Sequence, residues 1–428
     1  MEEKQNSGCL SVFVPFLLAC FAAIMAAWFL KGNGTAQRPQ SDSFSVIPVT
    51  QRAETTTRPT WETTTRPTGE TTTEADTQQP AAEEGKYHYR QLNAVEKDIY
   101  NHVREAAEAG KTSLTLNNVD AKTYVAALER GIYAFVRDYP LYFWLREGYE
   151  TTYITRSGIN MDTVNIDVSC FGFWSARMAT QKYQAELQAK VQEIAAHAEY
   201  LRTDYEKALF VHDYLVTHTQ YDTENYEASK QDPHAGDIDY IFTAYGCLVQ
   251  SKCVCEGYAK AYKLILETLG IECVIVSGTG NDELHSWNFI QLDGEYYWVD
   301  VTWDDLGTEN WPNEAKHTYF CMTTEQISKT HKAETEYFTV PVCTANKYNY
   351  YVYNDLMLTA ADEAKMAEIL NRAPGEKLFE FGFTDAARST VERISNRGNL
   401  TDVPRIADSE QYWYFIDDEN NALLVHIK

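Results

Sequence analysis

The sequence feature that constrains the fold most tightly is the pair Asp293-Gly294 between two apolar segments, residues 284–292 and 295–303. Asp-Gly between such segments is one of the strongest local signals for a two-residue β-hairpin turn. The turn fixes the strand pairing, because Leu292 must then face Glu295 and every other facing pair follows. A four-residue loop would leave this register unchanged, whereas a one-residue slip would move each side chain to the opposite face.

This register predicts that a histidine and an aspartate share one face of the hairpin. His285 faces Thr302 and Asp300 faces Trp287, so His285 and Asp300 are diagonal neighbours, about 7 to 8 Å apart at the backbone. The opposite face is apolar as well, and we therefore expect a sheet that is covered on both sides. A buried imidazole and carboxylate need polar partners, and each can serve the other.

A cysteine at the start of an expected helix supplies a third reactive group. Cys255 opens an apolar pattern of helical spacing that closes at Gly270, a residue suited to the left-handed cap. Unpaired backbone donors and the positive end of the helix dipole favour a thiolate there. Gly257 keeps the first turn free of bulk, so another backbone or a substrate can approach. Residues 272–277 are expected to form a buried strand, followed by a loop containing Gly278, Gly280 and Asn281.

Thiol, imidazole and carboxylate are the parts of a cysteine active site, in which the base accepts the thiol proton and the carboxylate sets its tautomer. We therefore predict Cys255 as nucleophile, His285 as base and Asp300 as orienting group. The segments VCEGYA (254–259), HSWN (285–288) and WVDVTWD (298–304) resemble, in this order, the three motifs of the transglutaminase-like superfamily. The resemblance covers roughly residues 203–320, and its spacing is similar to that of compact bacterial members. Ser286 stands where alanine is common.

The resemblance implies an α+β, papain-like core in which a helix bearing the cysteine packs against an antiparallel sheet bearing the other two residues. The family includes protein cross-linkers, deamidases, peptidases and inactive forms, so it implies a site and not one reaction. The expected function is a thiol enzyme that acts on carboxamide or peptide bonds of a protein or peptide through a thioester. The alternatives are a cysteine peptidase of surface or cell-wall peptides and a non-catalytic binding module that keeps the fold.

Composition and pattern divide the chain into five expected regions. These are a transmembrane anchor (1–31), a Thr/Pro-rich disordered linker (32–85), a mainly helical N-terminal region (86–202), the transglutaminase-like core (203–320) and a small C-terminal α/β region (321–428). Expected helices cover 94–107, 121–139 and 175–201, and another starts at a capping box formed by Thr203 and Glu206. Expected strands cover 149–155 and 163–169, with a turn at Gly158 and Asn160. After residue 320 we expect Tyr-rich strands around 348–358, a helix over 360–372 and a hairpin through 412–416 and 423–427.

The location of the folded part follows from the first residues. Residues 9–30 carry no charge and are long enough to cross a bilayer as a helix. The apolar character lasts to the end of this segment, which favours a retained anchor over a cleaved signal peptide; a lipoprotein signal at Cys20 is a third interpretation. The next segment repeats TTTRPTWE as TTTRPTGE and has too few apolar side chains to offset its ordering entropy. We expect a single-pass protein of the cell membrane whose folded part is extracellular.

Charge and ligand spacing exclude some partners. The chain has 37 Lys and Arg against 62 Asp and Glu, a formal net charge of −25 that repels phosphate backbones. Nucleic acid is therefore not an expected partner, whereas a protein or peptide substrate, such as a surface or cell-wall protein, is. The sequence has no Cys-x-x-Cys pair and no His/Cys cluster of zinc-finger spacing, so we predict neither a metal nor a cofactor.

Several assignments stay open at the level of sequence. Cys253 is an alternative nucleophile, but Cys255 directly precedes Glu256-Gly257-Tyr258 and opens the helix. The backbone N–H of Cys255 is the first candidate donor to an oxyanion, with Tyr221 and Gln250 as candidates for the second. Cys247, Cys253 and Cys273 either form disulfides or stay as buried thiols.

Other polar and aromatic residues near the motifs have a simpler interpretation. Three tryptophans either form the walls of a cleft or pack in a core, and three histidines and one aspartate are expected to be structural or surface groups. The tryptophans are Trp287, Trp298 and Trp303; the polar residues are His212, His218, His317 and Asp304.

Overall fold

A computed structural model of the chain describes residues 85–111, 113–145, 150–155, 162–167, 181–231, 239–307, 314–359, 363–372, 378–396 and 412–427. The expected anchor, nearly all of the expected linker and the expected turn at Gly158 and Asn160 lie outside these ranges. Among the described residues, no helix combines the length and the apolar character needed to cross a bilayer.

The N-terminal region combines two helices with a small sheet. A 3-10 turn, η1 (Tyr89–Gln91), precedes α3 (Ala94–Glu108) and α4 (Ala121–Asp138), which confirm the two expected helices. Strands β2 (Glu150–Thr155) and β3 (Asp162–Asp167) pair antiparallel as expected. A third strand, β1 (Ser113–Val119), pairs with β3 and was not predicted, because it lies between two helical patterns and has no hairpin partner next to it in the sequence.

The helical layer of the core is built from α6 (Gln181–Ala198), α7 (Asp204–His218), α8 (Thr223–Gln231), α9 (Ala244–Leu248) and α10 (Cys255–Thr268). The capping box at the start of α7 is formed as predicted by Thr203 and Glu206. The short 3-10 turn η2 (Asp239–Phe242) precedes α9. Strands β4 (Gln220–Tyr221) and β5 (Lys252–Cys253) pair in parallel and tie the end of α7 to the residues before α10.

The sheet of the core has five antiparallel strands in the order β10-β6-β7-β8-β9. They are β6 (Cys273–Gly280), β7 (Glu283–Leu292), β8 (Glu295–Val299), β9 (Phe320–Met322) and β10 (His331–Ala333). The hairpin register is the predicted one, because Leu292 faces Glu295 and Asn288 faces Val299. Asp293 and Gly294 both have positive φ, 52° and 83°, as the tight hairpin turn requires.

Two predicted boundaries in this sheet are wrong. β8 ends at Val299 and not at residue 303, because Asp300 accepts hydrogen bonds from two backbone N–H groups and caps the short helix α11 (Val301–Asp304). Thr302 therefore lies on a helix and does not face His285 in the sheet. β6 continues to Gly280, so Gly278 and Gly280, which we expected in a loop, belong to the strand.

The two faces of the sheet bury two different cores, as the alternating pattern predicts. One face of the hairpin joins the main core, which includes residues of α10, and the other face joins a smaller aromatic core. In the hairpin strands, the main core takes Ile290, Leu292, Tyr297 and Val299, and the smaller core takes Trp287, Phe289 and Trp298.

The C-terminal region has a four-stranded sheet of order β11-β12-β14-β13 and two longer helices. Its elements are α13 (Tyr350–Tyr353), β11 (Met357–Leu358), α14 (Glu363–Arg372), β12 (Leu378–Phe383), α15 (Asp385–Asn396), β13 (Tyr412–Asp417) and β14 (Ala422–Ile427). The predicted helix over 360–372 and the closing hairpin are confirmed. The predicted Tyr-rich strands are wrong at residues 350–353, where tertiary packing of the tyrosines overrides their preference for strands. β12 and α15 were not predicted.

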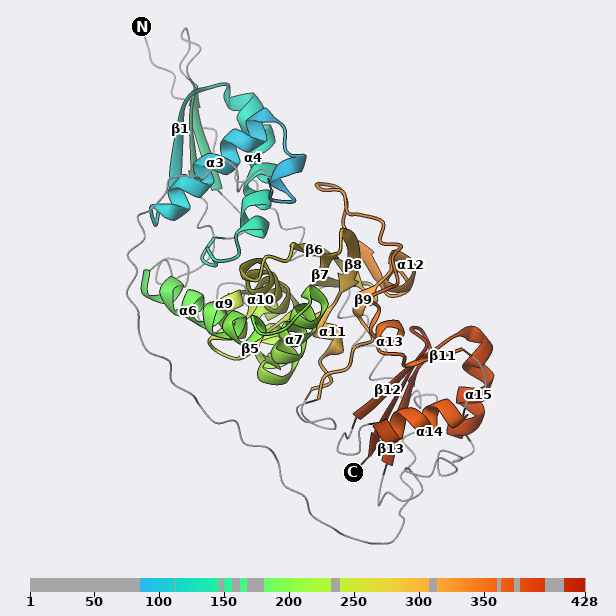
Figure 1. Ribbon diagram of the computed structural model, residues 1–428. Helices are drawn as coiled ribbons and strands as arrows, with labels where there is room; N and C mark the ends of the chain where they lie inside the picture. Colours follow the sequence, from blue (N-terminus) through green and yellow to red (C-terminus); the bar gives the residue numbers. More distant parts are fainter. Residues whose placement is uncertain are drawn as a thin grey trace, which may run out of the picture.

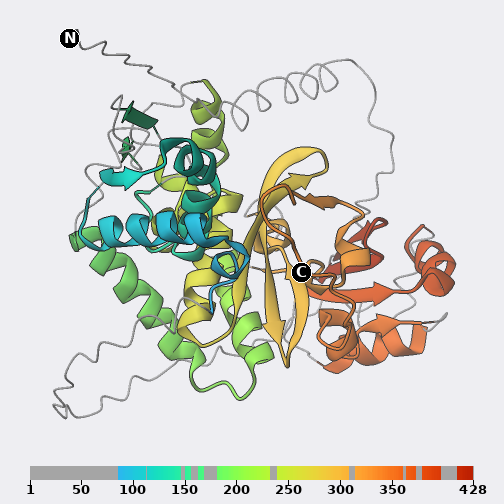
Figure 2. The same cartoon turned by 90° about the horizontal axis from the view of Figure 1, so that it is seen from above.

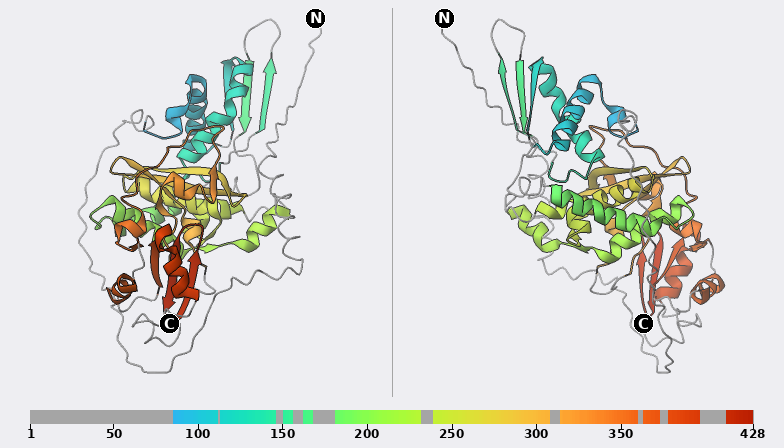
Figure 3. Two further views of the ribbon diagram at one scale, coloured as in Figure 1. Left: turned by 90° about the vertical axis from the view of Figure 1, so that its right-hand side faces the viewer. Right: turned by 60° about the vertical axis from the view of Figure 1, so that its left-hand side comes forward.

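The core lies between the two other regions. Figures 1 and 3 show α3, α4 and β1 at one end of the molecule and the C-terminal sheet with α14 and α15 at the other. Seen from above, the sheet of the core stands between the green helices and the red C-terminal region (Figure 2). A short helix, α12 (Thr324–Ile327), follows β9 on the side away from α10 (Figure 1). The described residues thus form an α+β fold with a cysteine-bearing helix packed on an antiparallel sheet.

Candidate active site

The nucleophile candidate is the first residue of α10. Cys255 is partly exposed, and the cap residue Val254 supplies no side-chain acceptor to the N–H groups of the first turn. Gly257 fits the expected close approach: a Cβ there would lie 2.5 Å from the Cβ of Cys253 and 2.8 Å from the carbonyl oxygen of Ile241. The first turn of α10 is therefore packed against backbone on one side.

His285 and Asp300 are joined by a short hydrogen bond. His285 lies on β7, and its Nε2 is 2.6 Å from Oδ2 of Asp300. Oδ1 of Asp300 accepts the N–H groups of Thr302 at 3.0 Å and Trp303 at 3.2 Å. The end of β8 and the start of α11 thus fix the carboxylate, and the carboxylate orients the imidazole.

The Cys255 side chain completes this group of three. Burial by itself lowers the pKa of His285, but attraction to Asp300, the hydrogen bond with Asp300 and a hydrogen bond with Cys255 raise that pKa to about 10. His285 is therefore an imidazolium at neutral pH. Because Nε2 binds Asp300, Nδ1 is the ring nitrogen left for the thiol.

Asp300 stays ionised although it is buried, because its partners are histidines. Burial raises its pKa, but the charge of His285 and hydrogen bonds from two histidines outweigh burial and hold the pKa well below its ordinary range. The sequence-predicted residues Cys255, His285 and Asp300 therefore meet at one point in the structure.

A second histidine of this site, His331, was not predicted from the sequence. It lies on β10, and its Nε2 is 2.9 Å from the same Oδ2 of Asp300, while its Nδ1 is 2.8 Å from Oγ1 of Thr330. No motif marks this residue, because β10 is only three residues long and follows the three motifs in the sequence.

Two glycines of β6 make room for the rings of this site. β6 lies between β10 and β7, and Gly280 pairs with His331 on one side while Gly278 pairs with His285 on the other. A Cβ at Gly280 would lie 3.3 Å from Cδ2 of His285 and 2.8 Å from Cζ2 of Trp303. Glycine inside a strand often marks the close approach of a neighbouring group. Gly278 and Gly280 were therefore the features of the sequence that could have indicated an aromatic neighbour here.

The alternative nucleophile, Cys253, lies in a different environment. It is fully buried, and burial raises the pKa of its thiol well above the ordinary value. The six cysteines within the described ranges are all free thiols: Cys247, Cys253, Cys255, Cys273, Cys321 and Cys343. The structure thus favours buried thiols over disulfides for Cys247, Cys253 and Cys273.

The two candidates for a second oxyanion donor differ in position. Tyr221 pairs with Cys253 across β4 and β5, and burial together with the nearby Cys255 raises the pKa of its hydroxyl, which keeps it a donor. The side chain of Gln250 is instead hydrogen-bonded to Tyr245. Tyr221 is therefore the better candidate.

The tryptophans divide between core and site. Trp287 and Trp298 are buried in the smaller core, and the Trp287 ring stacks on His285 at 5.8 Å between centroids and 17° between planes. Trp303 is only partly buried, with its ring centroid 4.4 Å from that of His331. Core packing thus accounts for Trp298, whereas Trp287 and Trp303 border the histidines.

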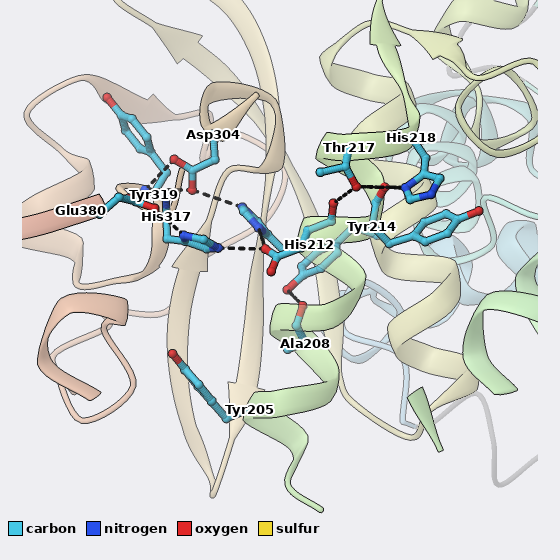
Figure 4. Close-up of polar contacts among 12 residues, drawn as sticks. Tyr205, Ala208, His212, Tyr214, Thr217, His218, Asp304, His317, Tyr319 and Glu380 are labelled. Atoms are coloured by element: carbon cyan, nitrogen blue, oxygen red, sulfur yellow. Dashed lines mark hydrogen bonds and ion pairs between the residues drawn. The ribbon is translucent and has the colours of Figure 1, made fainter. Parts of the chain in front are cut away.

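The described residues contain two groups of side chains with the composition of a metal site. One is His285, Asp300 and His331, all of them buried, and two of these residues belong to the group of three that includes Cys255. The other is His212, Asp213 and His317, which lies on α7 and in the segment before β9 (Figure 4). His218 is exposed and hydrogen-bonded to the Tyr214 carbonyl, as expected for a surface residue.

Comparison with known proteins agrees with this geometry. The model of the family described as the transglutaminase-like superfamily matches residues 189–305, a range that holds Cys255, His285 and Asp300. Residues 189–305 form a transglutaminase-like domain. The transglutaminase-like domain therefore starts within α6 and ends just after α11.

One curated relative and several solved structures resemble parts of the chain. Kyphoscoliosis peptidase of Mus musculus is 28% identical over 113 residues, which are 24% of this chain and 16% of that protein. A solved structure of a TGase is 16% identical, with a TM-score of 0.27, and covers 39% of this chain and 47% of that chain. A protein of Cytophaga hutchinsonii, proposed to be a cysteine protease, is 15% identical, with a TM-score of 0.21 over 33% of this chain and 52% of that chain. The chain thus matches less than two thirds of each of these proteins.

Proposed function

We propose that the transglutaminase-like domain is a cysteine acyl-transfer enzyme that acts on carboxamide or peptide bonds of a protein or peptide. The observation that carries this proposal is the hydrogen-bonded series Cys255, His285 and Asp300, with the thiol partly exposed at the start of α10. A binding module would not need an imidazole that is charged, buried and in contact with a thiol.

The first half of the reaction forms a thioester. His285 carries its proton on Nδ1 before the attack, and the sulfur of Cys255 attacks the carbonyl carbon of the substrate as a thiolate. The C–N bond breaks, and His285 returns the proton to the leaving nitrogen, which departs as ammonia or as an amine. Asp300 keeps the ring oriented and stabilises its charged form.

The second half of the reaction releases the acyl group. His285 accepts a proton from water or from an amine as that group attacks the thioester, and the sulfur leaves as the thiolate. Water yields a carboxylate, and a lysine amine yields an isopeptide bond. The N–H of Cys255 is the first candidate donor to the oxyanion, and the Tyr221 hydroxyl is the second.

A second candidate outcome is peptide hydrolysis, since the mouse relative is named a peptidase. Both outcomes use the same nucleophile and the same thioester. They differ in which nitrogen leaves and in which nucleophile resolves the intermediate.

Three assays on the full chain test the proposal and separate its outcomes. They are release of ammonia from a glutamine-containing protein, incorporation of a fluorescent primary amine into that protein, and release of fragments from an unfolded protein. Activity in any assay that disappears in Cys255→Ala supports acyl transfer. Equal signals from Cys255→Ala and the native chain would contradict it.

We also propose that the enzyme acts at the cell surface, tethered through residues 9–30. This proposal rests on the uncharged apolar segment and the Thr/Pro-rich repeats that follow it. Protease treatment of intact cells should remove the folded part if the proposal is right. Protection until the cells are lysed would contradict it.

A further inference from the structure

A second cluster of polar groups, which includes two buried histidines, lies apart from Cys255, where α7 meets the C-terminal sheet. His212 and Asp213 come from α7, and His317 comes from the segment before β9. Nδ1 of His212 and Nε2 of His317 each lie 2.9 Å from Oδ1 of Asp213. The two rings thus point at one carboxylate oxygen from two sides, and the three ligand-type atoms lie within 4.8 Å of one another.

The other nitrogen of each ring is held by its own carboxylate. Nε2 of His212 is 3.2 Å from Oδ2 of Asp304, and Nδ1 of His317 is 2.7 Å from Oε1 of Glu380 (Figure 4). Histidines that bind metal ions have this arrangement, because a carboxylate on the far nitrogen fixes the ring and makes the near nitrogen more basic. The arrangement occurs twice here, once for each ring that faces Asp213.

Both outer carboxylates are themselves fixed by the backbone. Asp304 accepts the N–H of Tyr319 on both oxygens, at 3.1 and 3.0 Å. Oε2 of Glu380 accepts the N–H of His317 at 2.9 Å and the hydroxyl of Tyr351 at 3.1 Å. The ring of His317 is further stacked on Tyr350 at 3.8 Å between centroids. The two imidazoles are therefore held in place before any ligand binds.

A cavity beside the cluster leaves room for further ligands. Its volume is about 250 Å³, and Asp213, His317, Glu314 and Glu380 contribute to its wall. The side chain of Asp213 is 41% exposed, whereas those of His212 and His317 are buried. An ion from solvent could thus reach Asp213 without unfolding the chain.

We propose that His212, Asp213 and His317 form a binding site for a divalent transition-metal ion, with zinc as the best match. Two imidazoles and one carboxylate with an open fourth position are the ligand set of many zinc sites, and nitrogen ligands disfavour calcium and magnesium. Neighbouring ligand atoms of tetrahedral zinc lie about 3.3 Å apart, so the 2.9 Å contacts need to open by roughly half an ångström. Water in the cavity supplies the remaining ligand.

Binding exchanges the ion for two protons. Each ring now donates an N–H to Asp213, from Nδ1 of His212 and from Nε2 of His317. Both protons leave when the two nitrogens bind the ion. The site would also link α7 to β12 through His317 and Glu380.

This inference does not depend on the proposed enzyme activity, and its test avoids the thiol. The full chain carrying Cys255→Ala is freed of metal with a chelator and titrated with Zn²⁺ by calorimetry. We expect one Zn²⁺ per chain. Co²⁺ in its place should give a visible spectrum typical of nitrogen and oxygen ligands without a thiolate charge-transfer band.

Variants in the same background assign the site. Asp213→Asn should weaken Zn²⁺ binding at least tenfold, and Glu380→Gln should weaken it about 10- to 100-fold through the ring that it orients. The matched control His218→Gln removes an exposed histidine from the same helix and should leave affinity unchanged. Thermal unfolding of each metal-free variant checks that the fold is kept.

Three results would overturn the inference. The first is the absence of stoichiometric Zn²⁺ binding by the Cys255→Ala chain. This result alone would be sufficient. The second is unchanged affinity in both Asp213→Asn and Glu380→Gln. The third is loss of binding in His331→Gln with full binding in Asp213→Asn, which would assign the ion to the cluster around Asp300.

Discussion

Nε2 of His285 lies 2.6 Å from Oδ2 of Asp300, although Asp300 stands one residue beyond the last residue of β8. The aspartate therefore has two tasks: it caps α11 with Oδ1 and orients the imidazole with Oδ2. Because the cap fixes the carboxylate, the direction of the His285 ring is set by backbone geometry and not by side-chain packing alone. The same relationship gives the predictions about Asp300 and His331 below.

Cys255 should be the cysteine that reacts fastest with iodoacetamide near neutral pH. Its side chain is partly exposed and contacts His285, whereas the other five described cysteines are buried. We expect alkylation at least tenfold faster than at Cys253, measured as a time course of peptide masses. Cys255→Ala serves as the control for assignment of the modified peptide. Equal rates at Cys253 and Cys255 would contradict the choice of nucleophile.

Asp300→Asn should lower kcat by about 10² to 10⁴-fold, because the neutral amide no longer stabilises the imidazolium and can favour the wrong ring tautomer. Once a substrate is known from the three assays, steady-state kinetics measure the effect. The cap on α11 should survive, since an asparagine oxygen also accepts N–H groups. A variant that keeps more than half of the native kcat would show that Asp300 does not orient the base.

The pH dependence of stability should report the His285–Asp300 pair. The pKa of His285 is about 10 in the folded chain and about 6.5 in an unfolded one. A raised folded-state pKa contributes stability that is fully present below pH 6.5 and is lost as the pH rises to 10. Urea unfolding between pH 6 and pH 10 should therefore show falling stability, with a smaller fall in Asp300→Asn. Parallel curves for the two proteins would contradict the assignment.

His331→Gln should weaken the enzyme without removing the nucleophile or the base. Loss of the second hydrogen bond to Oδ2 leaves Asp300 less firmly held, so we expect kcat to fall roughly tenfold with little change in KM. The pKa of His285, followed by NMR of the imidazole, should shift as well. If His331 served only as core packing, stability would fall but that pKa would stay where it is.

Gly257→Ala should destabilise the fold by about 1 to 3 kcal/mol, because the new Cβ would collide with Cys253 and the Ile241 carbonyl. It should also lower activity by moving the first turn of α10. Gly270→Ala is the matched control at the other end of the same helix. It meets open space but has a φ of +80°, so we expect a cost of about 1 to 2 kcal/mol and unchanged activity. Chemical unfolding and the acyl-transfer assay separate the two effects.

The hairpin and the helix that begins at Cys255 were predictable because local chemistry fixes them. Asp293-Gly294 sets a register, and the register together with alternating side chains gives both cores of the sheet. The end of β8 was not predictable from the pattern, since Val301 and Trp303 continue the apolar alternation while Asp300 starts a helix. A short helix that begins at a strong cap cannot be predicted from the periodicity of apolar residues.

The polar contacts that were not predicted from the sequence have a different cause in common. His331 and His317 lie far along the sequence from the aspartates that they contact, and both histidines come from segments with no motif of their own. His317 and Glu380, for example, are separated by 63 positions. Such contacts depend on how whole regions pack, which single-sequence patterns do not encode. The glycines of β6 were the nearest signal, and they indicated close approach without naming the neighbour.

The division of β7 between two cores restricts how this chain can change in length. Adding residues at the Asp293-Gly294 turn lengthens a loop and leaves Asn288 opposite Val299. Adding one residue between Trp287 and Asn288 would instead turn both Trp287 and His285 to the opposite face of the strand. Related chains should therefore differ in the size of this turn, while the distance from the histidine to the turn stays the same.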